Sequence, residues 1–313
     1  MASPALALVF PGQGSQSVGM LAALSELHPG LKATFSEASE GAGIDLWALA
    51  QGGPEAMLNR TEYTQPALLA AGVAVWRLWQ QQGGPRPALL AGHSLGEYTA
   101  LVAAGALSLG DGAHLVRIRG QLMQDAAPEG TGAMAAVLGA EDALVEAVCV
   151  EASGAQVVVP ANYNSPGQIV IGGDAAAVDR ALALLADKGV RKAVKLAVSV
   201  PSHTPLMREA ANRLAVTMAG LRWASPAIPV VQNVDAGVHD DVEAIQQALV
   251  RQLYLPVQWT GCVQALAARG ISRIGECGPG KTLTGLGKRI DKTLDQRALG
   301  EPDGLVGALA DWA

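Results

Sequence analysis

The chain has 313 residues, 50% of them hydrophobic, enough to bury one large core or a core with a smaller second domain. It carries 22 Lys and Arg against 28 Asp and Glu, a net charge of -6, which argues against nucleic acid as the main partner. The three cysteines lie far apart without metal-ligand spacing, and no apolar run is long enough to cross a bilayer, so we expect a cytoplasmic protein with no metal and no membrane contact.

A short apolar run, Leu6–Phe10, predicts a buried parallel strand that ends at the glycine-rich loop Pro11–Gln16. The loop fails as a dinucleotide fingerprint, because Ser17 stands where a third glycine or alanine is needed. A plain turn and a source of oxyanion-binding N–H groups both remain open for it. The helical patterns that follow cover Gly19–Leu27 and Leu31–Ala42, and after a break at Gln51–Pro54 a long helix runs from Thr64-Gln65-Pro66 through Gln82.

The next apolar run, Ala88–Ala91, meets the sequence Gly92-His93-Ser94-Leu95-Gly96 and then an amphipathic pattern. This strand, tight turn and helix match the G-x-S-x-G nucleophile elbow, whose glycines are needed because the turn packs against its own helix. The pattern predicts Ser94 as a nucleophile, with the Leu95 N–H and the positive helix end beside a developing oxyanion. The alternative is a glycine-rich turn that holds an incidental serine.

Residues Asp111–Asp125 are predicted to form a helix in which Arg119 has only apolar neighbours three and four positions away. Arg119 is therefore expected to point into the protein, where an unpaired guanidinium is too costly to keep. A buried Asp or Glu is the common partner for such an arginine. Its position one helix after Ser94 favours a substrate carboxylate instead.

From Gly130 to Val200 the pattern becomes β-α-β-β-α-β, which predicts a ferredoxin-like α+β subdomain inserted in a mostly parallel α/β core. We expect the core to comprise residues 1–129 and 199–313 and the insertion residues 130–198, with the site in the cleft between them. The amides of Asn162 and Asn164 either face this cleft or cap the turn between two strands. The predicted elements are strand Ala133–Leu138, helix Asp142–Ala152, strands Gln156–Pro160 and Gln168–Ile171, helix Ala175–Asp187 and strand Arg191–Val200.

Among the histidines, His203 is the best candidate for a general base, because it precedes the predicted helix Leu206–Met218. A helix N-terminus disfavours imidazolium and would keep the ring neutral. His93, beside Ser94, is expected to point the opposite way along the strand end and to be a packed residue.

Near the C-terminus, a predicted strand, Ile271–Glu276, leads into a stretch, Gly275–Thr282, that matches the phosphate-binding pattern G-x-x-x-x-G-K-[ST]. Pro279 removes one of the amide donors that phosphates need, and no metal-binding aspartate is evident on a neighbouring strand. We therefore do not expect nucleotide hydrolysis.

Taken together, the motifs resemble those of the malonyl-CoA:acyl carrier protein transacylases of fatty-acid synthesis, in the order of that family from residue 6 to about residue 290. The resemblance also implies a hydrolase-like core. It is carried by Phe10-Pro-Gly-Gln-Gly-Ser-Gln16, Gly92-His-Ser-Leu-Gly-Glu-Tyr98, Arg119-Gly120, Gly130-Thr-Gly-Ala-Met134, Asn162-Tyr-Asn-Ser-Pro-Gly-Gln168, Val200-Pro-Ser-His203, Arg251-Gln252-Leu253 and Gly278-Pro-Gly-Lys281.

By that resemblance, Ser94 takes the malonyl group from malonyl-CoA, with His203 as the base, and passes it to the phosphopantetheine thiol of acyl carrier protein. The N–H groups of Gln13 and Leu95 would hold the oxyanion, and Arg119 would bind the malonyl carboxylate. The resemblance further implies that the main-chain carbonyl of Gln252 orients His203. We also assign Gln65 and Asn162 to the substrate-binding site, and expect no cofactor beyond the CoA thioester that serves as substrate.

The carrier protein is acidic in this family, so the resemblance implies a local basic patch. Three other functions remain open: an acyltransferase that serves polyketide carriers, a serine esterase or thioesterase, and a non-enzymatic scaffold that docks carrier proteins. The candidate docking residues are Arg191, Lys192 and Lys195 on the insertion and Lys281, Lys288 and Arg289 near the C-terminus.

Overall fold

The structure contains two β-sheets, and the larger one is parallel. The computed structural model describes residues 5–128, 130–198 and 200–312, and in this part of the chain five strands form the sheet in the order β7-β2-β1-β8-β9, with every neighbouring pair parallel. Parallel strands need crossover helices, which places helices on both faces. The strands are β1 (Ala5–Phe10), β2 (Leu89–Gly92), β7 (Val230–Val231), β8 (Ile271–Glu276) and β9 (Asp295–Ala298).

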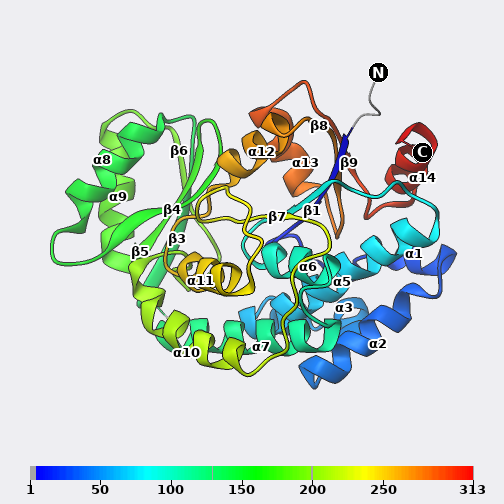
Figure 1. Cartoon of the computed structure of the whole chain (residues 1–313). Helices are drawn as coiled ribbons and strands as arrows, with labels where there is room; N and C mark the ends of the chain where they lie inside the picture. The colour runs from blue at the N-terminus through cyan, green and yellow to red at the C-terminus, as the bar shows by residue number, and fades with distance from the viewer. Residues whose placement is uncertain (1–4, 129, 199, 313) are drawn as a thin grey trace.

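The two faces of this sheet are covered by different helices, because successive side chains of a strand point to opposite sides. Leu8 and Phe10 of β1 join the large core that contains α5 (Thr61–Gln81), α6 (Leu95–Ala103) and α7 (Leu109–Ala126). Ala7 and Val9 face the other way, against α12 (Trp259–Ala268) and α13 (Thr282–Ile290). The sheet therefore lies between two helical layers, as Figure 1 shows.

The N-terminal helices differ in detail from the prediction. The helix expected at Gly19–Leu27 begins only at Ala22, and the long helix begins at Thr61 rather than Thr64. A short helix was missed although Asp45 caps it, accepting a 2.8 Å hydrogen bond from the Ala48 N–H. The observed elements are α1 (Ala22–Leu27), α2 (Leu31–Ala42), α3 (Leu46–Gly52) and α4 (Glu55–Leu58).

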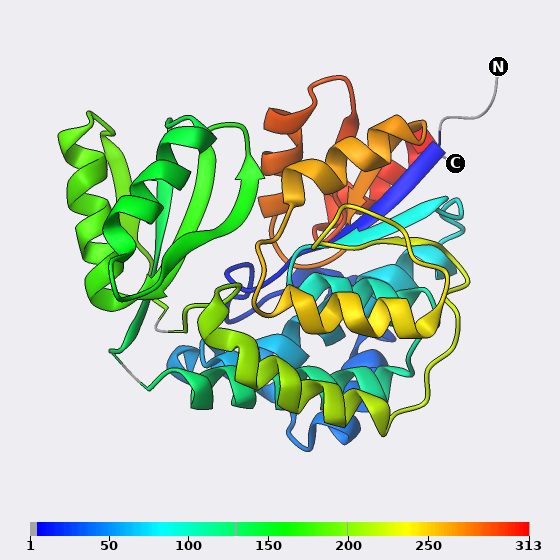
Figure 2. The ribbon, with the colours of Figure 1, turned by 60° about the vertical axis from the view of Figure 1, so that its left-hand side comes forward.

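A second, antiparallel sheet follows in the chain order strand, helix, two strands, helix, strand. Its strands lie in the order β4-β5-β3-β6, and its two helices share one hydrophobic core with it. In Figures 1 and 2 this green part of the chain stands beside the parallel sheet and its helices. The elements are β3 (Gly132–Leu138), α8 (Asp142–Ser153), β4 (Val158–Ser165), β5 (Gln168–Asp174), α9 (Ala175–Asp187) and β6 (Lys192–Lys195).

Three strand predictions in this sheet were wrong in extent. The strand expected at Gln168–Ile171 continues to Asp174. The strand expected at Gln156–Pro160 runs from Val158 to Ser165, since β4 continues its pairing with β5 through the asparagines that were read as turn residues. The strand expected at Arg191–Val200 ends at Lys195; Leu196 adds one last bond to β3, and the chain then leaves the sheet, so that Val198 and Val200 line a pocket. Ser199 of that prediction lies outside the described residues.

Direct bonds join the antiparallel sheet to the rest of the chain. Val257 makes two main-chain hydrogen bonds to β4. Its N–H donates to the Ala161 carbonyl and its carbonyl accepts from the Tyr163 N–H, both at 2.9 Å. Arg289 of α13 donates to the Gln168 side chain at 2.7 Å. The remaining elements are the 3-10 turn η1 (Pro205–Met207), α10 (Arg208–Ala219), α11 (Val242–Gln252) and α14 (Pro302–Trp312). Across the described residues, every helix is too short or too polar to span a lipid bilayer.

Candidate active site

Ser94 sits in a strained turn between β2 and α6, as the elbow motif predicts. Its φ of 52° and ψ of -108° are backbone angles that residues with a Cβ rarely adopt, so the surrounding structure must hold the turn in place. Both flanking glycines are required by close approach. A Cβ at Gly92 would lie 1.9 Å from the Gly96 carbonyl carbon, and one at Gly96 would lie 2.0 Å from the Phe10 carbonyl oxygen.

Asn233 holds this turn from the side of β7, a role that the sequence did not reveal. Its side-chain oxygen accepts from the Ser94 N–H at 2.7 Å, and its amide nitrogen donates to the Gly92 carbonyl at 2.7 Å. One buried amide thus satisfies the main chain on both sides of the strained corner.

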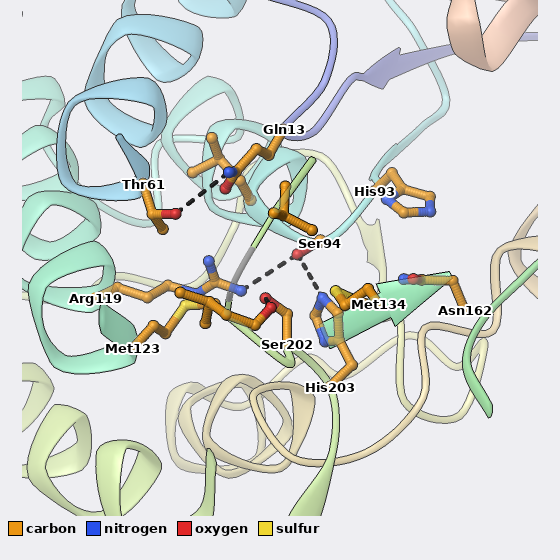
Figure 3. Close-up of a pocket in the computed structure, with 13 residues that line it drawn as sticks. Gln13, Thr61, His93, Ser94, Arg119, Met123, Met134, Asn162, Ser202 and His203 are labelled. Atoms are coloured by element: carbon orange, nitrogen blue, oxygen red, sulfur yellow. Dashed lines mark hydrogen bonds between the residues drawn. The ribbon is translucent and has the colours of Figure 1, made fainter. Parts of the chain in front are cut away.

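His203 lies directly opposite the serine, with its Nε2 2.7 Å from the Ser94 Oγ (Figure 3). Its Nδ1 lies 2.7 Å from the main-chain oxygen of Gln252, and its own N–H donates to the Leu253 carbonyl at 3.0 Å. Because a carbonyl can only accept, Nδ1 carries the proton, and Nε2 is left free to accept one from the serine. The His203–Gln252 pairing implied by the family resemblance is present.

His203 lies just before a helical segment, as predicted, because the 3-10 turn η1 begins at Pro205 and continues directly into α10 at Arg208. Its own φ is 62°. The pKa of His203 is lowered to about 3, mainly by burial and then by the positive charge of Arg119, against the raising effect of the Gln252 carbonyl. Desolvation and a neighbouring cation therefore keep the imidazole in its base form.

Arg119 is buried, with 1% of its surface exposed, as its apolar helical neighbours predict. Its guanidinium donates to the side-chain oxygens of Gln65 at 2.8 Å and Gln252 at 3.0 Å, and to the Ser94 Oγ at 3.3 Å. None of the ion pairs within the described residues involves it, so its direct partners are all neutral. Burial lowers its pKa, while Tyr98 and Glu97 nearby raise it. Arg119 is therefore a buried cation whose charge a ligand carboxylate can neutralise.

These groups line a small pocket of about 120 Å³ between the two sheets (Figure 3). Gln13, Leu95 and Asn162, all predicted as site residues, lie in its wall, whereas Gln65 and Gln252 stand behind Arg119 and are not part of the lining. Apolar side chains complete the wall. The full lining is Gln13, Thr61, His93, Ser94, Leu95, Arg119, Met123, Met134, Asn162, Val198, Val200, Ser202 and His203.

A larger hollow of about 430 Å³ adjoins the pocket and shares Gln13, Thr61, Val198 and Val200 with it. Its other walls include polar side chains, among them Asn59 and Arg60.

His93 is a packed residue, as predicted, but it also borders the pocket. Its Nε2 lies 2.8 Å from the Asn164 side-chain oxygen, and its ring packs 5.5 Å from that of Trp259. Burial lowers its pKa. Asn164 therefore fixes His93 rather than capping a turn, while Asn162 faces the pocket.

The phosphate-like pattern at Gly275–Thr282 already holds an anion of its own. The buried carboxylate of Glu276 accepts from the N–H groups of Leu283 at 3.0 Å and Thr284 at 2.8 Å, at the start of α13. A phosphate would need those same donors. The structure therefore agrees with the sequence argument against nucleotide binding here.

The cysteines offer no second nucleophile. All three are buried and free of disulfides, and burial raises the pKa of Cys149 to about 12 and that of Cys262 and Cys277 further. Among the described residues, no three His, Cys, Asp or Glu side chains gather as they would around a metal ion.

A strained serine, a neutral histidine within hydrogen-bond distance and a buried cation define a site for acyl transfer to serine. The sequence agrees: residues 7–309 match the acyl transferase domain family, and the chain belongs to that family.

Relatives within the family share nearly its whole length. The malonyl CoA-acyl carrier protein transacylase of Salmonella typhimurium is 55% identical over 97% of this chain and 98% of that protein, and the one of Bacillus subtilis is 41% identical over 95% and 94%. Among solved structures, the malonyl-CoA:acyl carrier protein transacylase FabD of Xanthomonas oryzae is 78% identical and superposes with a TM-score of 0.99, covering all of both chains. A malonyl-transacylase bound to a type II polyketide acyl-carrier protein is 51% identical with a TM-score of 0.96, over 98% of this chain and 99% of that one.

Proposed function

We propose that the protein transfers a malonyl group from malonyl-CoA to the phosphopantetheine thiol of an acyl carrier protein. The observation that carries the proposal is the contact of Ser94 Oγ with both His203 Nε2 at 2.7 Å and Arg119 Nη2 at 3.3 Å. A nucleophile, a base and a carboxylate-binding group are thereby gathered at one point. The names and the 55% identity of the transacylase relatives support the choice of malonyl.

In the acylation step, the Ser94 Oγ attacks the thioester carbonyl while His203 Nε2 takes the hydroxyl proton. The main-chain N–H groups of Gln13 and Leu95 would stabilise the tetrahedral oxyanion, since both residues line the pocket. Collapse breaks the carbon–sulfur bond, and His203 returns the proton to the departing CoA thiol. The Gln252 carbonyl supports the transient imidazolium at Nδ1.

Arg119 is proposed to bind the free malonyl carboxylate. Its present partners are two glutamine oxygens and the serine hydroxyl, which orient it without neutralising it. A carboxylate that enters the pocket would gain a charge-assisted, two-point contact with the guanidinium. Gln65 would then act by fixing Arg119 from behind, and Asn162 by contacting the acyl group from the facing wall.

In the second half-reaction the carrier thiol attacks the acyl-serine, and the same proton transfers run in reverse. These steps use only the chain's own groups and the two thiols, so we propose no cofactor. The hollow that adjoins the pocket offers the route for both thiol arms. The narrow pocket keeps bulk water from the ester until the second thiol arrives.

We also propose the finer fold assignment: a hydrolase-like core of residues 1–129 and 199–313, and a ferredoxin-like insertion of residues 130–198. The β-α-β-β-α-β order and the antiparallel arrangement β4-β5-β3-β6 support the second part. The elbow at the end of a central parallel strand supports the first. Residues 129 and 199, at the proposed boundaries, lie outside the described residues.

The acidic carrier is proposed to dock on the basic side chains singled out in the sequence, three of them in or next to β6 and three in or next to α13. The six predicted docking residues are exposed, although Lys195 is paired with Asp179 at 2.6 Å and Arg289 is bonded to Gln168. The solved complex of a relative with a polyketide carrier supports polyketide acyl-carrier proteins as the second candidate class of partner.

The test is a transfer assay with malonyl-CoA in the presence and absence of holo acyl carrier protein. We expect malonyl-carrier to form and CoA to be released in equal amounts, and Ser94→Ala to abolish both. Rapid malonate release without a carrier would instead indicate an esterase or thioesterase. Comparing fatty-acid and polyketide carriers in the same assay separates the two partner classes.

A further inference from the structure

We infer that Glu97 is a positioning residue that sets the malonyl selectivity of Arg119 by holding the side chain of Gln252 in place. This inference rests on the proposed function. Glu97 lies in the first turn of α6, three residues after Ser94, and none of its surface is exposed. It does not line the pocket, so any effect on the substrate must pass through its neighbours.

The connection from Glu97 to Arg119 consists of two consecutive hydrogen bonds. The Gln252 Nε2 donates to Glu97 Oε2 at 2.9 Å, and Arg119 Nη2 donates to the Gln252 Oε1 at 3.0 Å. The Gln252 amide is thus held between a carboxyl group and a guanidinium. The buried carboxyl group and the guanidinium are linked through a neutral amide rather than in direct contact, which leaves Arg119 free to bind a ligand carboxylate.

This arrangement permits only one orientation of the amide. An arginine can only donate, so the Gln252 oxygen must face Arg119 and its nitrogen must face Glu97. The same nitrogen also donates to the Ser94 carbonyl at 2.8 Å. Loss of the Glu97 acceptor would leave the Gln252 nitrogen with one of its two contacts, so that the amide is held less firmly and Arg119 is oriented less precisely.

Glu97 has a second contact, which ties it to the nucleophile turn. Its Oε2 also accepts from the Asn233 N–H at 2.9 Å, and Asn233 is the residue that clamps Ser94 and Gly92. One carboxyl oxygen therefore fixes the position of the serine turn relative to Arg119. This relative position matters for a substrate that must be held at both ends, its carbonyl at Ser94 and its carboxylate at Arg119.

The position of the Glu97 oxygen, rather than its charge, is what this inference requires. Burial raises the pKa of Glu97 to about 7, against the lowering effect of its bonds from Gln252 and Asn233, and the protonated acid can still accept both bonds. Its other oxygen, Oε1, has no hydrogen-bond partner among the described residues. Glutamine keeps the acceptor at the same reach, whereas aspartate withdraws it by roughly 1.5 Å, one carbon–carbon bond length.

The test measures single-turnover acylation of Ser94 by malonyl-CoA and by acetyl-CoA, which lacks the carboxylate. The ratio of the two rate constants is the selectivity. We expect Glu97→Asp to lower this ratio at least about tenfold through loss of the malonyl rate, since a hydrogen bond to a charged or buried group is withdrawn. Glu97→Gln is expected to rescue it to within about threefold of wild type.

The matched control is Glu276→Asp, because Glu276 is an equally buried glutamate whose carboxylate serves only the start of α13. We expect it to lower thermal stability and leave the selectivity ratio unchanged. Glu97→Asp that slows both substrates equally, or keeps the wild-type ratio, overturns the inference and leaves Glu97 a purely structural residue.

A tenfold fall of the selectivity ratio in Glu97→Gln also overturns the inference. If Glu97→Asp does not fold, the result with Glu97→Gln is the test. Wild-type protein that is not acylated by malonyl-CoA would instead contradict the proposed function, so the two failures are distinguishable.

Discussion

Replacement of Arg119 by alanine is the perturbation whose effect follows most directly from the geometry. Arg119 is 1% exposed and has no carboxylate partner within the described residues, so in the proposed acyl-enzyme the malonyl carboxylate would be its only direct counter-charge. Removing one partner of a buried ion pair costs about 3–5 kcal/mol. Because about 1.4 kcal/mol is a factor of ten, Arg119→Ala should lower kcat/KM for malonyl-CoA by at least about 100-fold.

The same variant should acylate Ser94 with acetyl-CoA at a rate within about tenfold of wild type, because the 3.3 Å contact of Arg119 with the Oγ is long. Arg117→Ala is the matched control: Arg117 lies on the same helix, but its guanidinium sits 5.8 Å from the Tyr63 ring, outside the pocket lining. Thermal melts establish that each variant is folded. Unchanged malonyl kinetics in Arg119→Ala, or an equal loss with both substrates, would refute the carboxylate-binding role.

Three further predictions concern the buried groups around the serine. Because the pKa of His203 is lowered to about 3 rather than the ordinary 6.5, the single-turnover acylation rate should stay level from pH 8 to pH 5; a decline centred near 6.5 would contradict this. The pKa of Glu97 is raised on folding, so the folded protein holds a proton that the unfolded chain has released, and the stability this group contributes is full below about 4.5 and is lost as the pH rises through about 7. In denaturant titrations, the free energy of unfolding of Glu97→Gln should therefore rise relative to that of wild type between pH 5 and pH 8, by on the order of 3 kcal/mol at most. If the free energies of the two proteins depend on pH in the same way, the pKa of Glu97 is not shifted. Asn233→Ala removes both bonds that hold the turn at Ser94, so the acylation rate should fall more than tenfold with malonyl-CoA and acetyl-CoA alike; an unchanged rate in a folded variant would show that the turn needs no clamp.

Local patterns were enough to single out Ser94 as a nucleophile and Arg119 as a buried cation. The elbow glycines specify a corner that only one local geometry satisfies, and the apolar neighbours of Arg119 specify its burial. The approach of His203 to Ser94 was not visible in the spacing of 109 residues and depends on the fold. The resemblance to a family supplied the Gln252 carbonyl, which no periodicity could indicate.

The supporting residues were missed because their roles arise only from tertiary contacts. Asn233 and Glu97 sit in ordinary loop and helix positions, and only the packing of β7 and α11 on the elbow brings them together with Gln252. The same limit explains the wrong length of β6. β6 ends at Lys195 because the chain then leaves the sheet and leads to His203 at the pocket. The residues of the strand do not show where this departure occurs.

In the proposed mechanism, Ser94 carries the malonyl group between two thiols. Intact-mass spectrometry after a brief incubation with malonyl-CoA, without a carrier protein, tests it most directly. We expect a mass increase of one malonyl group in the wild-type protein, its removal on addition of holo acyl carrier protein, and no increase in Ser94→Ala. An unmodified wild-type protein that nevertheless forms malonyl-carrier, or an adduct that persists in Ser94→Ala, would contradict it.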